Sequence, residues 1–151
     1  MIQFPLCSSV IRLAELNLSE YFDFIRKYSD ISMILCDQEL ASLGDAYVNF
    51  IYSLALSKST GKPIGRKLDS HVLSSALKKA GIRALLPYRT DRHKQADAAE
   101  ALVVYGWLSG AISIKEALEI LSREGDISDN LSFLLKLILE RSKFRLERRR
   151  S

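Results

Sequence analysis

The sequence has little of several residue types, and each shortage excludes a class of protein. Its 151 residues include only two cysteines, Cys7 and Cys36, which are too few for a disulfide framework and lack the paired spacing of a zinc site. We therefore expect both to be small core residues in a protein from a reducing compartment. The two histidines, His71 and His93, have no serine or cysteine at a spacing that suggests nucleophilic catalysis.

Long hydrophobic runs are also missing. No apolar stretch has the length and purity of a membrane span. The first residues, MIQFPLCSSV, lack a basic region followed by a long apolar run, so they do not resemble a secretory leader. With 48% hydrophobic and 26% charged residues, the chain is typical of one domain over residues 1–151, and we expect it to be cytoplasmic, with no membrane partner. A formal net charge of +4 favours a polyanion partner without requiring one.

Proline and glycine are few, and the apolar residues between them recur at three- and four-residue spacings. This pattern predicts an all-α fold with loops over 58–68 and 86–93. The expected helices cover residues 8–16, 20–28 with Ser19 as cap, 37–57, 71–80 with Ser70 as cap and Gly81 as stop, 94–109 with Gly110 as stop, a helix from the capping box of Ser113 and Glu116, and a last helix from near Ser128 that ends in a basic tail over about 141–151.

Two acids stand out in KQADAAEALVVYGWLSG, residues 94–110, because the surrounding residues belong to a core helix. Asp97 and Glu100 are three residues apart and so share one helix face, where two like charges are unfavourable unless a cation or water receives them. An Asp-x-x-Glu pair is also common on solvated helix faces. Both interpretations remain open from the spacing alone.

A third acid follows an unusual glycine in SLGDAY. Gly44 within a helix costs about 1 kcal/mol relative to alanine, which suggests close approach by another backbone. If this helix crosses the one above, Asp45, Asp97 and Glu100 could converge and share a hard divalent cation such as Mg²⁺. With phosphate as a further ligand, such a site could support phosphodiester hydrolysis.

LGDA at 43–46 and DAAEAL at 97–102 resemble the nuclease domain of the ribonuclease III family, whose motifs read E-x-L-E-F-L-G-D and D-x-x-E-A-L. The likeness covers roughly residues 37–125. It implies an all-α homodimer that cuts both strands of double-stranded RNA, with one Mg²⁺-dependent site per subunit and Mn²⁺ as a possible substitute. By position, Asp45, Asp97 and Glu100 would be the catalytic metal ligands. The implied products carry a 5′ phosphate and a 3′ hydroxyl.

The chain departs from that pattern at two positions. Gln38 and Ala41 stand where the family usually has glutamates, and neither Asp37 nor Glu39 lies where it could replace them. The chain also resembles the short Mini-ribonuclease III branch, in having alanine at position 41 and in lacking a double-stranded-RNA-binding domain, and small archaeal proteins of the family. We therefore expect a three-carboxylate site and RNA held by the nuclease domain itself.

Lysine and arginine beside the site could hold an A-form duplex through its phosphates, although each could equally be an ordinary solvated residue. Tyr105 and Trp107 are interpreted as core or dimer contacts. The predicted RNA-binding residues are Lys62, Arg66 and Lys67, with Lys58 nearby, then Arg89, Arg92, His93 and Lys94, and a further basic group is Arg145, Arg148, Arg149 and Arg150.

The sequence thus supports a leading hypothesis and two alternatives. The first is a Mg²⁺-dependent endoribonuclease acting on double-stranded or structured RNA, with a role in the maturation of ribosomal or other stable RNA. The second is a non-catalytic RNA-binding protein of the same fold, in which Gln38 and Ala41 record the loss of metal affinity. The third is a helical interaction protein with no RNA partner.

Overall fold

The structure is a computed structural model that describes residues 18–151, and within this range every regular element is a helix, which confirms the all-α prediction. The helix expected over 8–16, and Cys7 with it, lie outside the described residues. The α-helices are α2 (Ile31–Leu35), α3 (Gln38–Thr60), α4 (Ser70–Lys79), α5 (Arg92–Leu108), α6 (Ile114–Leu121) and α7 (Ile127–Arg150), and the 3-10 helices are η1 (Leu18–Glu20), η2 (Asp23–Lys27) and η3 (Ile82–Leu85).

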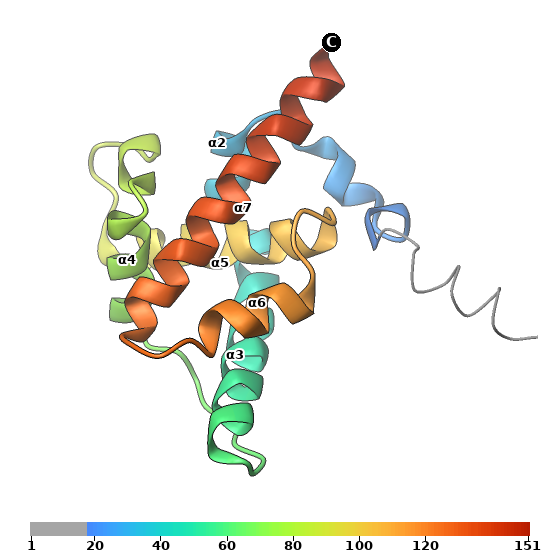
Figure 1. Cartoon of the computed structure of the whole chain (residues 1–151). Helices are drawn as coiled ribbons and strands as arrows, with labels where there is room; N and C mark the ends of the chain where they lie inside the picture. Colours follow the sequence, from blue (N-terminus) through green and yellow to red (C-terminus); the bar gives the residue numbers. More distant parts are fainter. Residues whose placement is uncertain (1–17) are drawn as a thin grey trace, which may run out of the picture.

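Helix α5 is the centre of the fold. It packs against α2, α3, α4 and α7, and α7 crosses in front of it in the view of Figure 1. From Ala98 to Gly106 every residue of α5 is buried, whichever face of the helix it occupies. A helical segment that is buried on all sides and, apart from Glu100, has no charged residue is typical of the interior of a core. Within this stretch, Gly106 lets the Ile138 side chain of α7 lie directly against the backbone of α5.

Aspartate is the N-cap of α2, α3, α4, α5 and α7, and for α4 it replaces Ser70, the cap that the sequence suggested. The side chain of Asp69 accepts a hydrogen bond from the His71 backbone N–H, so α4 begins one residue before the prediction. Asp126 caps α7 in the same way, and this helix begins at Ile127, next to the predicted start near Ser128. Both residue types are good N-caps, and the extended backbone of the earlier residue decides between them. The capping box of Ser113 and Glu116 is confirmed at the start of α6.

The segment before α3 differs from the prediction. Residues 20–28 were expected to form one α-helix, but they form parts of η1 and η2. In η2 and just beyond it only Ile25 and Tyr28 reach the core, while Phe22 and Phe24 are exposed, and a three-residue spacing suits a 3-10 turn. Helix α2 was not predicted. Its C-cap, Cys36, is exposed, so the expectation of a core cysteine is wrong there.

The basic C-terminal segment continues α7 as regular helix. Ser142 and Leu146 are buried and keep one face of the helix against the core, so residues 141–150 are an extension of α7. Tyr105 is buried and packs edge-on against Tyr28, with ring centroids 5.6 Å apart. No helix in the described range is long and apolar enough to cross a bilayer.

Candidate functional site

The site is built where α3 crosses α5. Gly44 lies directly against the main chain of Glu100, and a Cβ atom at position 44 would overlap the Glu100 carbonyl group. The sequence prediction of a close backbone approach at this glycine is therefore confirmed. The contact places Asp45, the residue after Gly44, beside the acidic turn of α5. The pairing of two motifs some fifty residues apart follows from this single crossing.

A cavity of about 730 Å³ opens at the crossing. Asp45, Asp97 and Glu100 all line it, so the three predicted site residues share one pocket. Glu100 is buried, with 8% of its surface exposed, while Asp45 and Asp97 are half-buried. Within residues 18–151, no three His, Cys, Asp or Glu side chains are close enough in this conformation to hold a metal ion. The pocket supplies candidate ligands without assembling them.

The carboxylates disfavour one another's ionisation. Burial, followed by the negative charges of Asp45 and Asp97, raises the pKa of Glu100 to about 8. A hydrogen bond between the carboxyl groups of Glu100 and Asp45 adds to this shift, and the positive charge of Lys67 opposes it. Burial also raises the pKa of Asp97, and the charges of Asp91 and Asp45 act in the same direction. A group of acids in this state gains stability from any cation that enters the pocket.

Asn49 is a residue of the site that the sequence analysis missed. One turn beyond Asp45 on α3, its side-chain amide donates to Asp45 Oδ1 at 3.0 Å. Its Oδ1 accepts a hydrogen bond from the Leu68 backbone N–H at 2.8 Å. Asn49 therefore holds the Asp45 carboxylate and, at the same time, the end of the 61–69 loop that lines the pocket. Its spacing of four residues from Asp45 was the available signal.

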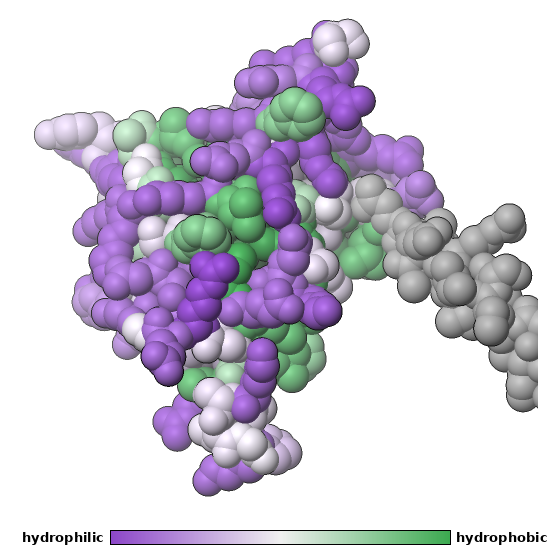
Figure 2. Space-filling model, in the orientation of Figure 1, coloured by the Kyte–Doolittle hydropathy of each residue, from purple (hydrophilic) through white to green (hydrophobic). Residues whose placement is uncertain are grey.

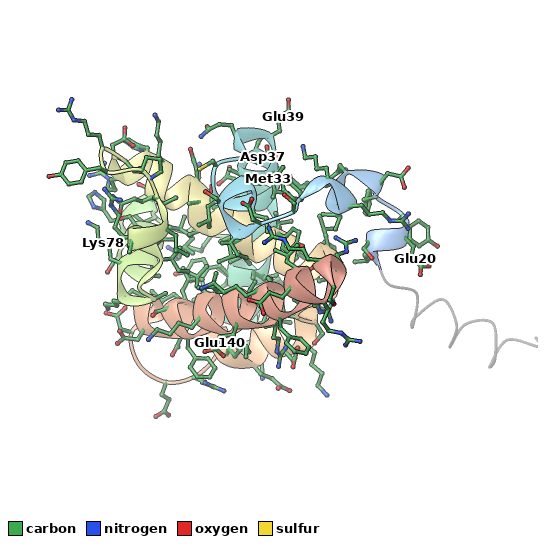
Figure 3. The ribbon with its side chains drawn as sticks, turned by 90° about the horizontal axis from the view of Figure 1, so that it is seen from above. Glu20, Met33, Asp37, Glu39, Lys78 and Glu140 are labelled. Atoms are coloured by element: carbon green, nitrogen blue, oxygen red, sulfur yellow. The ribbon has the colours of Figure 1, made fainter. Side chains whose placement is uncertain are left out.

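The two departures from the family pattern both lie at this pocket, because Gln38 and Ala41 line it. Neither neighbouring acid replaces them. Glu39 is exposed and projects outward from the start of α3, as Figure 3 shows. Asp37 is the N-cap of α3 and accepts a hydrogen bond from the Tyr28 hydroxyl at 2.6 Å.

The Asp37 carboxylate is stabilised in its charged form. Burial opposes its ionisation, but hydrogen bonds from Tyr28, the Leu40 backbone N–H and Lys27 outweigh burial and lower its pKa to about 2. The Lys27 ammonium lies 3.2 Å from Asp37 Oδ2. Asp37 therefore anchors the start of the helix that carries Asp45. Its carboxylate oxygens are engaged by these partners, so it does not replace the missing glutamates.

The predicted RNA-binding residues divide into two groups. Lys67 and His93 line the pocket and so share it with the carboxylates. The other predicted residues are exposed and do not line the pocket. The loop predicted over 86–93 ends earlier than expected, because Arg92 and His93 belong to the first turn of α5 and Asp91 is its N-cap. The exposed set outside the pocket is Lys58, Lys62, Arg66, Arg89, Arg92 and Lys94. Asp69 and Ser70, which the prediction did not include, also line the pocket.

Two comparisons with known proteins bear on this arrangement. A protein-family model described as Ribonuclease III matches residues 38–140. This range begins with α3 and includes every residue that lines the pocket at the crossing of α3 and α5. No curated protein matches the chain.

Proposed function

Because the chain belongs to the ribonuclease III family, we propose that it is a Mg²⁺-dependent endoribonuclease that hydrolyses double-stranded or structured RNA, including precursors of ribosomal or other stable RNA. The observation that carries the proposal is the single pocket that Asp45, Asp97 and Glu100 all line. Water would add to the phosphorus atom and the 3′ oxygen would leave, which gives a 5′ phosphate and a 3′ hydroxyl.

The residues present fit a hard divalent cation. Their donors are all carboxylate oxygens, the ligand type that Mg²⁺ prefers, and burial together with the charges of Asp45 and Asp97 raises the pKa of Glu100 although Lys67 opposes the shift. Asp45, Asp97 and Glu100 would hold the ion. When bound, Mg²⁺ supplies charge that stabilises the transition state at phosphorus and activates water. Binding would release the proton that Glu100 retains at neutral pH.

The chain's own groups prepare the pocket. Asn49 is hydrogen-bonded both to the Asp45 carboxylate and to the backbone of the 61–69 loop, so it holds the two in a fixed position relative to each other. Lys67 and His93 stand at the pocket wall, where each could contact a phosphate oxygen. Replacement of Asn49 by alanine should therefore lower the rate at saturating RNA and raise the Mg²⁺ concentration required, with little change in RNA affinity.

We also propose the homodimer that the family resemblance implies. Leu43 and Phe50, seven residues apart on α3, are 45% and 57% exposed on the same face of the helix. Large apolar side chains that stand free on a helix of the site are typical of a surface that another chain covers. Sedimentation of the protein before and after Phe50→Glu would test it, and an unchanged monomer in both cases would contradict it.

A non-catalytic RNA-binding protein is the second candidate, and the positions of Gln38 and Ala41 favour it. Both line the pocket, so the missing glutamates would have stood at the metal. If metal affinity is lost, the pocket would bind RNA through Lys67 and His93 without cutting it.

Cleavage of a long labelled RNA duplex separates the two candidates. The purified protein should cut it with Mg²⁺ or Mn²⁺, and Glu100→Gln should abolish the cut without loss of RNA binding. Glu140→Gln is the matched control, because this glutamate is exposed on α7 and does not line the pocket. Binding without cleavage at every metal concentration would support the non-catalytic alternative and overturn the enzymatic one.

A further inference from the structure

The positive charge of the chain is concentrated at its C-terminal end. Residues 141–151 contain six basic residues and one acidic residue, a net charge of +5, whereas the whole chain has +4. The remaining residues, which include the carboxylate pocket, therefore sum to −1. Since attraction to nucleic acid comes mainly from phosphate contacts with Lys and Arg, the end of α7 is a candidate surface for a polyanion. Figure 2 shows a largely hydrophilic surface over this end of α7.

Two adjoining hollows lie at this end of α7. One, of about 270 Å³, is lined by residues that include Tyr105, Arg145, Leu146, Arg148 and Arg149. The other, of about 410 Å³, is lined by Arg26, Tyr28, Ser29, Leu146, Arg149 and Arg150. Leu146 and Arg149 belong to both, so the hollows share a wall. Among the described residues that line them, none is acidic.

Some of these arginines are hydrogen-bonded within the protein, and others are free to contact a ligand. Arg145 donates to the backbone carbonyls of Ser109 and Gly110, and Arg150 donates to the Ser29 carbonyl at 2.7 Å. These bonds attach α7 to the end of α5 and to the segment before α2. Arg26 and Arg149, in contrast, form no hydrogen bond or ion pair with any residue that the structure describes, and both are exposed.

We propose that these two hollows form a second phosphate-binding surface, which grips the backbone of the RNA away from the point of cleavage. The inference rests on the proposed function for the identity of the polyanion. Adjoining hollows that share Arg149 suit the successive phosphates of one strand better than a single small anion. Tyr105, at the first hollow, follows Asp97 by eight residues, which is about 12 Å along α5. An RNA that contacts both places would have to span at least this distance.

Affinity for a labelled RNA duplex in EDTA, measured at several salt concentrations, tests the surface without cleavage. The charge reversal Arg26→Glu with Arg149→Glu should weaken binding by about tenfold or more and reduce the slope of log affinity against log salt by about 2. Lys136→Glu is the matched control, since Lys136 is exposed on α7 and lines neither hollow. It should change affinity by less than about twofold.

Single neutral variants keep the test decisive if the double reversal does not fold. Arg26→Gln and Arg149→Gln should each reduce the salt slope by about 1. Unchanged affinity and slope in folded variants would overturn the proposal. Arginine-dependent binding of inorganic tripolyphosphate, with no effect on RNA, would overturn the assignment to RNA. Failure of the wild-type protein to cut RNA with any metal would refute the proposed function alone, because the binding data judge this surface separately.

Discussion

The metal-free protein should lose stability as the pH rises, and Glu100→Gln should remove most of that loss. Burial beside Asp45 and Asp97 raises the pKa of Glu100 from 4.5 to about 8. Between these pH values the folded state retains a proton that the unfolded chain has released, so the free energy of unfolding falls as pH increases. A pKa difference of this size corresponds to about 5 kcal/mol once the pH exceeds 8.

Urea denaturation in EDTA at pH 5 and pH 8.5 measures the effect. Relative to wild type, Glu100→Gln should gain roughly 3 to 5 kcal/mol of stability between the two pH values, because glutamine carries no charge to bury. The exposed Glu140→Gln should gain nothing measurable. At pH 8.5, Mg²⁺ should stabilise the wild type, because it binds only the folded state, and should stabilise the variant far less.

One result would refute this reasoning. If the difference in unfolding free energy between Glu100→Gln and wild type is the same at pH 5 and pH 8.5, then Glu100 is not a carboxylate that its neighbours destabilise. The cation would then have no unfavourable charge to relieve, and the electrostatic argument for the metal would fail with it.

Three further substitutions test the surroundings of the pocket. Gly44→Ala should lower the unfolding free energy by about 1 to 3 kcal/mol, because the added Cβ atom meets the backbone of α5. Gly65→Ala is the control and should be close to neutral, because nothing lies near its Cβ position. Equal losses in a denaturation experiment would contradict the close crossing of α3 and α5. Asp37→Asn should lower the unfolding free energy by about 2 kcal/mol at pH 7, because the pKa of Asp37 is lowered to about 2 in the folded state. This contribution is complete above pH 3.8 and is lost as the pH falls through 2. If denaturation at pH 2 shows a loss of the same size, the stabilisation does not come from the ionised carboxylate. Gln38→Glu should shift the Mg²⁺ dependence of cleavage to lower concentration, and a metal titration that leaves it unchanged would show that position 38 does not act on the ion.

Local patterns were enough to predict a close backbone contact at Gly44 and a shared helix face for Asp97 and Glu100. An isolated glycine in a helix has a known cost, and the sequence indicated a close backbone contact at Gly44 that the structure contains. Likewise, helical spacing placed Asp97 and Glu100 on one face. These inferences succeeded because they depend on residues within one or two turns of each other.

The parts that escaped prediction depend on residues far apart in the chain. The four-residue spacing of Asn49 from Asp45 was a local signal, but its second bond, accepted from the Leu68 backbone N–H nineteen residues later, is one that no local pattern contains. Arg26 and Arg149 meet across the same hollow only after folding. The prediction of a helix over 20–28 was wrong for a related reason. Only Ile25 and Tyr28 are buried in the core, and the neighbouring aromatic residues are exposed.

The contact of Gly44 with Glu100 has a consequence for how the protein can vary. Where two helices touch through side chains, their separation depends on the sizes of those side chains and changes when the core is repacked. Here the two main chains are in direct contact, and the van der Waals radii of backbone atoms, which do not vary with sequence, set the distance between the helix that carries Asp45 and the acidic turn of α5. The hydrophobic interior behind the crossing can therefore exchange one apolar residue for another while the spacing of the carboxylate-bearing backbones is preserved.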